Sequence, residues 1–117
     1  MAVQVEGNVK TFPAGEVLAA IRRVKIDSDG NVVYADAGEA YDGVTQDAAA
    51  AIGDHVPVKL KSGAGSFKVT ADGAAACAAD LYGADDGKVS TTESGSVQFR
   101  AFEPATADGD IIEAGLV

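Results

Sequence analysis

The sequence predicts a mainly β fold: a small single-domain β-barrel or β-sandwich of short strands, with at most one or two short helical turns. The 117 residues include 14 Gly and only 3 Pro, and valine is the commonest apolar residue after alanine. This composition favours short strands joined by tight turns. Asp-Gly pairs, which accept the positive φ angles of hairpin turns, recur along the chain. They stand at Asp29-Gly30, Asp42-Gly43, Asp72-Gly73, Asp86-Gly87 and Asp108-Gly109. We expect an N-terminal arm over residues 1–10 and one β-domain over residues 11–117.

Alternation of apolar and polar residues marks the individual strands. Residues 22–35 predict a hairpin, because alternating segments flank the pair Asp29-Gly30. Residues 56–60 predict a strand in which Pro57 suits an edge position or a strand end, since proline donates no ladder hydrogen bond. Further strands are predicted at residues 67–70, 97–102 and 110–117.

Helix is predicted at one place only, residues 45–53. Thr45 would cap the first turn, Asp47 would favour the helix dipole and Gly53 would end the helix. The alanine-rich residues 73–81 fit either a short helix or a turn that enters a strand.

The charge balance excludes several classes of partner. The chain has 9 basic and 18 acidic residues and a net charge of −9. Nucleic-acid binding needs clustered Lys and Arg, and the longest basic cluster is the short run 22–25. The same balance disfavours an anionic membrane surface. No run approaches the ~18 apolar residues of a membrane helix, and residues 1–10 lack the features of a signal peptide.

Side chains suited to catalysis or metal binding are few. One Cys and one His give neither an internal disulfide nor a zinc cluster, so we expect no cofactor, no metal and no enzyme activity. His55, the single candidate base, stands where a turn enters a strand and is expected to face solvent. Cys77 lies among alanines and is expected to be a small buried apolar residue.

Acidic and glycine-rich segments are explained by turns and solvated faces. The run 27–31 resembles the start of a calcium loop, but Gly30 comes too early and Gly38 stands where a Glu is needed. It predicts a hairpin turn. The glycine-rich run 62–66 precedes a strand rather than a helix, which predicts a flexible hairpin loop rather than a phosphate loop. Two further acidic groups are expected to be solvated. They are Asp80, Asp85 and Asp86, and Asp108, Asp110 and Glu113.

The alanine content bears on assembly. Alanine buries little apolar area per residue, at about 25 cal/mol per Å², so the core of one copy is modest. Burial against further copies or a partner would compensate.

Four segments follow one another in a characteristic order. They are an opening tail and first strand, a central GVTQD phrase, a strand followed by DLY and DGKV, and a closing DGDI phrase. These segments are residues 9–15, 43–58, 69–74 with 80–82 and 86–89, and 101–112. Their order resembles the family of phage capsid decoration (cement) proteins, small head-stabilising proteins formerly grouped as a domain of unknown function.

The resemblance implies a small β-barrel or β-sandwich on the outer surface of the virion capsid, assembled in the host cytoplasm. It implies that the protein bridges neighbouring major capsid protein subunits as a homo-oligomer, with a trimer favoured and a dimer possible. A ligand that binds only the assembled shell stabilises that state. Alternation in residues 2–10 suits either addition of a strand to a coat-protein sheet or a frayed terminus. The expected capsid-binding residues are Val3, Val5, Val9 and Phe12. The expected inter-subunit or turn residues are Ala48, Ala49, Asp108 and Asp110.

Two other functions remain open. One is an accessory β-domain of a phage tail, spike or surface-layer assembly, which copy number would distinguish. The other is a small calcium- or carbohydrate-binding module. Sugar stacking needs exposed aromatic rings, and the chain has no Trp and only three Tyr, at positions 34, 41 and 82.

Overall fold

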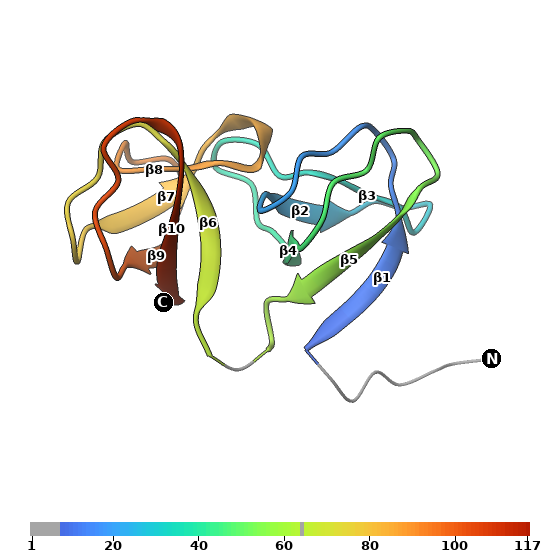
Figure 1. Cartoon of the computed structure of the whole chain (residues 1–117), viewed down its shortest axis with the longest axis horizontal. Coiled ribbons are helices and arrows are strands. Elements are labelled where there is room, and N and C mark those ends of the chain that lie inside the picture. The colour runs from blue at the N-terminus through green and yellow to red at the C-terminus, as the bar shows by residue number, and fades with distance from the viewer. Residues whose placement is uncertain (1–7, 64) are drawn as a thin grey trace.

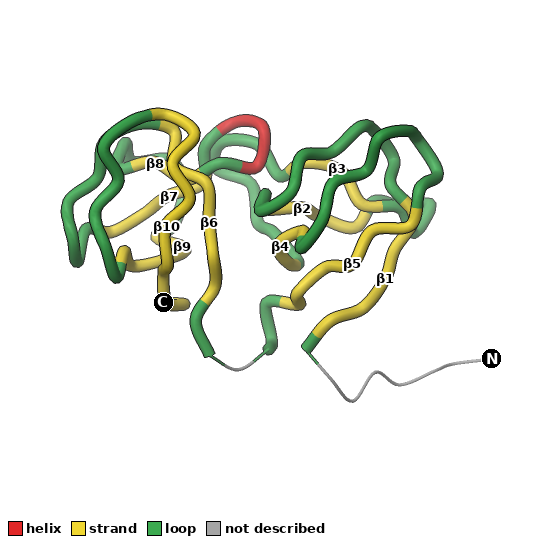
Figure 2. Tube along the Cα trace, in the orientation of Figure 1, coloured by secondary structure: helices red, strands yellow, loops and turns green. Residues whose placement is uncertain are grey.

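The computed structural model describes residues 8–63 and 65–117, and its regular elements are ten strands and one 3₁₀ turn joined by loops (Figures 1 and 2). The mainly β prediction is confirmed. In chain order the elements are β1 (Val9–Pro13), β2 (Arg23–Ile26), β3 (Val32–Tyr34), β4 (Gly43–Thr45), β5 (His55–Leu60), β6 (Phe67–Asp72), β7 (Asp80–Gly83), η1 (Asp85–Gly87), β8 (Val89–Ser90), β9 (Val97–Ala101) and β10 (Asp108–Leu116).

The first five strands form an antiparallel sheet in the order β1-β5-β4-β2-β3. The predicted hairpin over 22–35 is confirmed, because β2 and β3 pair with Val24 opposite Tyr34. In its turn the Asp27 carboxylate accepts hydrogen bonds from the backbone N–H groups of Asp29 and Asn31. Gly30 takes φ +83°, which glycine adopts without strain. The acidic run is therefore a turn, as predicted.

The last five strands close into a small barrel in the order β10-β6-β8-β7-β9. The predicted C-terminal strand is confirmed as β10, which pairs with both β6 and β9. Alternation predicted β9 correctly: Phe99 and Ala101 are buried in the barrel, while Arg100 is exposed.

The sheet and the barrel lie side by side, and the segment after β5 leads from one to the other (Figure 1). The prediction that residues 62–66 form a hairpin loop is therefore wrong. Both sides of β5 are already paired, with β1 and with β4, so the next strand cannot join it. It pairs with β10 instead, 36 or more residues further along the chain.

Each half has its own apolar core. The sheet core contains Ala14, Leu18, Val24, Val32, Ala49, Val56 and Val58. The barrel core contains Phe67, Val69, Leu81, Phe99 and Ile112, together with Tyr41 and Val44 from the other half. Tyr41 stacks on Phe99 with ring centroids 5.1 Å apart. Side chains from the first half of the sequence thus complete the core of the second.

A buried arginine ties the two halves together. Arg23 of β2 is fully buried, and its guanidinium donates to the carbonyls of Ala35, Ala84 and Lys88 at 2.8, 2.7 and 3.0 Å. It also donates to the Gln98 amide oxygen at 2.9 Å. Burial lowers the pKa of Arg23 to about 10. The basic run 22–25 is therefore not a surface cluster; its second residue is a core element.

The predicted helix over 45–53 is wrong. Thr45 ends β4, and the residues after it run as bends and turns. Ala49 bridges Leu18, with N–H···O distances of 2.8 and 3.0 Å, and both side chains are buried. A helix this short gains little from its own hydrogen bonds, so burial of Ala49 against Leu18 decides the backbone path.

Pro57 does not lie at an edge or a strand end, because β5 is an interior strand of the sheet. The sheet tolerates the missing N–H because β4 ends beside it: the last β4 pair is Thr45 with Val58. Gln46 then donates its N–H to the Pro57 carbonyl at 2.8 Å. Proline is accepted in a central strand where the neighbouring ladder stops.

Cys77 is exposed, which corrects the expectation of a buried residue. The alanine-rich segment that contains it is a loop that enters β7 at Asp80. Ala75 is the member of this loop that turns inward, through a bridge to Ala105. The register of that bridge leaves the thiol on the solvent side, beside the Phe102 carbonyl at 3.5 Å.

Candidate functional site

The candidate attachment surface is the free edge of β1. This strand pairs with β5 on one side and is the last strand of its sheet (Figure 1). An unpaired edge presents backbone N–H and C=O groups to a strand of another chain. The five strands of the barrel, as far as the chain is described, close on one another and leave no such edge.

The two faces of β1 have different surroundings. Phe12 lies opposite the buried Val56 and packs on the sheet core, so it is half-buried. Val9 lies opposite Lys59 on the other face and is 46% exposed. Among the predicted capsid-binding residues, Val9 is therefore the side chain open to a partner, and Phe12 holds the strand in place. Val3 and Val5 lie outside the described residues.

The opposite edge of the same sheet is covered. Ala14 forms a bridge with Val32 of β3, and Gly15 donates its N–H to the Val32 carbonyl at 2.8 Å. A Cβ on Gly15 would lie 2.8 Å from a methyl group of Val33, so a side chain here would force one of the two segments to shift. Within residues 8–63 and 65–117 the chain covers β3 at Val32, and the outer edge of β1 has no partner strand.

Ala48 and Ala49, predicted as inter-subunit or turn residues, differ in exposure. Ala49 is buried against Leu18, whereas Ala48 is exposed. Sequence reasoning missed two exposed apolar side chains nearby, Val17 and Ile52. They belong to the two segments that the Leu18–Ala49 bridge joins. No sequence pattern marked them, because each adjoins residues that also suit a core.

Asp108 and Asp110 organise the entrance to β10. The Asp110 carboxylate accepts hydrogen bonds from the N–H and hydroxyl of Thr106, both at 2.8 Å, and from the Ala107 N–H at 3.2 Å. These bonds lower the pKa of Asp110. Asp108 pairs with the Lys88 ammonium at 2.9 Å, which lowers its pKa as well. Asp110 thus acts in the turn at the start of β10, whereas Asp108 joins this strand to the residue after η1.

Within residues 8–63 and 65–117 no group of three or more His, Cys, Asp or Glu side chains is placed to hold a metal ion. His55 is exposed at the start of β5, as predicted. No helical segment of the described chain has the length and apolarity needed to cross a bilayer.

Comparison with known proteins gives a structural match across nearly the whole chain. No protein-family model and no curated protein matches the sequence. Among solved structures, the chain is similar to the N base of the head fiber protein gp8.5 of bacteriophage phi29, with a TM-score of 0.79 and 19% sequence identity. The match covers 93% of this chain and 92% of that one. The chain therefore has the fold of the N base of a phage head fiber.

Proposed function

We propose that this chain is a structural protein of a bacteriophage head, attached to the outer surface of the assembled shell. The observation that carries the proposal is the fold shared with a head fiber base over 93% of the chain, at a TM-score of 0.79. The segment order that resembles capsid decoration proteins supports the same assignment independently of the coordinates.

On this proposal the β1 edge contacts the major capsid protein. It is the open edge of the sheet, and the exposed Val9 lies on it. Binding across neighbouring coat subunits would stabilise the assembled shell over its free subunits, because a ligand stabilises the state to which it binds. Association into a trimer would multiply a modest contact by avidity.

Copy number tests the proposal. Quantitative mass spectrometry of purified, density-banded particles measures the ratio of this chain to the coat protein. A decoration protein is expected at about one copy per coat-protein subunit, or at one copy per capsomer. A few copies per particle would replace that role with a fiber, tail or vertex role. Absence from particles would overturn the assignment to the head.

A reconstitution experiment tests the edge. Purified protein is added to expanded shells that lack it, and bound protein is measured by co-sedimentation. Val9→Lys places a charge on the proposed contact and should weaken binding at least tenfold. Ile111→Lys is the matched control, because Ile111 is similarly exposed, at 54%, on β10 of the barrel. Equal binding by both variants would contradict the β1 edge as the contact.

A further inference from the structure

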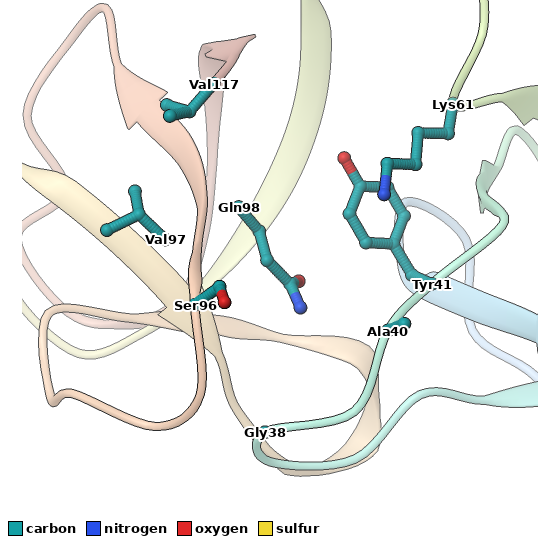
Figure 3. A pocket seen from close by; sticks show the side chains of 8 residues that line it. All are labelled: Gly38, Ala40, Tyr41, Lys61, Ser96, Val97, Gln98 and Val117. Atoms are coloured by element: carbon teal, nitrogen blue, oxygen red, sulfur yellow. The ribbon is translucent and has the colours of Figure 1, made fainter.

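A hollow of about 260 Å³ lies between the sheet and the barrel (Figure 3). Tyr41 and Lys61 line it from the sheet half, and Val97 and Gln98 line it from β9 of the barrel, with Val117 beside them. Its volume is below the roughly 300–1,000 Å³ of sites that hold drug-sized ligands. A ligand here consists of a few heavy atoms.

The Tyr41 hydroxyl has no hydrogen-bond partner in the described part of the chain. Tyr41 is only 3% exposed, and its ring is fixed against Phe99. Figure 3 shows its hydroxyl directed toward the hollow between Lys61 and Gln98. Because buried polar groups are nearly always paired, an unpaired hydroxyl at a hollow indicates a missing partner. Burial raises the pKa of Tyr41, so the phenol keeps its proton and needs an acceptor.

Two cations flank the Tyr41 ring. The Lys61 ammonium lies 5.0 Å from the ring centroid and the Arg23 guanidinium lies 6.0 Å from it. Neither cation takes part in an ion pair within residues 8–63 and 65–117, where the ion pairs are Lys25–Glu39 and Lys88–Asp108. Of the two, Lys61 lines the hollow. Arg23 does not, and its guanidinium donates to protein acceptors.

Gln98 is not a free ligand group. Its amide oxygen accepts from Arg23 at 2.9 Å, and its amide nitrogen donates to the Glu39 carbonyl at 2.8 Å. The other polar side-chain groups of the lining are the Tyr41 hydroxyl, the Lys61 ammonium and the Ser96 hydroxyl. Val97 and Val117 complete the lining on the barrel side.

We propose that this hollow binds a carboxylate, with the Tyr41 hydroxyl donating to one oxygen and Lys61 supplying the opposite charge. Charge-assisted hydrogen bonds of this kind are the strong ones. Two donors match a monoanion with two oxygens. The carboxylate belongs either to a small free acid or to an acidic side chain of a protein partner. This inference is independent of the proposed attachment through β1.

The test is a titration of the full-length protein with sodium propionate, followed by NMR shifts of backbone amides around Tyr41 and Lys61, at ionic strength held constant with sodium chloride. Saturable shifts are expected, with a dissociation constant in the millimolar range. Tyr41→Phe and Lys61→Met should each raise that constant at least fivefold. Lys68→Gln is the control, because Lys68 is an exposed lysine that lies outside the hollow.

A second titration distinguishes the sources of the carboxylate. Its probes are an acetylated, amidated Ala-Glu dipeptide and its Ala-Gln counterpart. Tighter binding of the Glu peptide than of propionate supports a protein side chain, and binding of propionate alone supports a free acid.

Shifts that chloride or phosphate reproduces, shifts that do not saturate, or equal binding by wild type and both hollow variants would overturn the proposal. Lys61 is exposed, so Lys61→Met keeps the test valid even if Tyr41→Phe folds poorly.

Discussion

The guanidinium of Arg23 lies directly against the backbone of Gly83, with no space between them for a side chain. A Cβ on Gly83 would lie 2.8 Å from Nη1 and 2.9 Å from Cζ of Arg23. The glycine lets β7 of the barrel approach β2 of the sheet closely enough for Arg23 to reach the Ala84 carbonyl beyond it. This contact joins the two halves of the molecule.

Replacing Arg23 should lower the free energy of unfolding, because its hydrogen bonds join the two halves. Arg23→Met leaves the carbonyls of Ala35, Ala84 and Lys88 without their buried donor. An unpaired buried acceptor costs about 1–3 kcal/mol, so we expect the free energy of unfolding to fall by more than ~3 kcal/mol in urea denaturation. Arg100→Met, at an exposed arginine of β9, should stay within ~0.5 kcal/mol of wild type. Equal losses in the two variants would refute the role given to Arg23.

Gly83→Ala should cost more folding free energy than Gly115→Ala, although the added Cβ comes closer to its neighbour at Gly115. A Cβ on Gly115 would lie closer to its neighbour, 2.3 Å from the Phe102 ring. Phe102 is 52% exposed, so its ring can move into solvent. The Arg23 guanidinium is held by six hydrogen bonds, four of them at 3.0 Å or less. We expect a loss of about 2–3 kcal/mol for Gly83→Ala and below about 1 kcal/mol for Gly115→Ala.

A double-mutant cycle gives the control. Gly83→Ala should lower the free energy of unfolding less in the Arg23→Met background than in wild type, because the guanidinium that the added Cβ would contact is absent. Additive losses would show that the strain at Gly83 has another source.

Acid should remove the contribution that the Asp110 carboxylate makes to the stability of the folded state. Hydrogen bonds from Thr106 and Ala107 lower its pKa below the ordinary value of 3.8. A carboxylate with a lowered pKa in the folded state stabilises above its unfolded pKa, and that contribution is lost as pH falls through the folded pKa. Asp110→Asn should therefore melt below wild type near pH 7, and the two Tm values should converge in strong acid, near pH 2.

Asp29→Asn is the matched variant for this measurement, since Asp27 rather than Asp29 accepts the hydrogen bonds of that turn. Its Tm should differ little from wild type at either pH. A constant Tm gap between Asp110→Asn and wild type across the same pH range would contradict the linkage.

The Cys77 thiol should react in the native state. It is exposed, so Ellman's reagent should modify one thiol per chain without denaturant, at a rate within about tenfold of the urea-unfolded protein. Cys77→Ser should leave the Tm within about 2 °C of wild type. If Cys77 reacts only after unfolding, its thiol is buried and the exposed position described above is wrong.

Local patterns determined much of the fold. Alternation and Asp-Gly turns predicted the β2–β3 hairpin, β9 and β10, because side-chain period and turn chemistry act over a few residues. The same patterns predicted that the acidic run at 27–31 is a turn. Residues 45–53 had real helical features, yet burial of Ala49 against Leu18, 31 positions away, outweighed them.

What the sequence by itself determined is the fold class, the acidic surface and the positions of most strands. Only the tertiary structure decided that two sheets form, that β1 keeps an open edge, and that Arg23 is buried and the Tyr41 hydroxyl unpaired at a hollow. The physical reason is that these features depend on which strand fills each ladder and on contacts between residues far apart in the chain. Arg23 reaches Ala84 across 61 positions, and nothing in the local run 22–25 distinguishes a buried arginine from a solvated one.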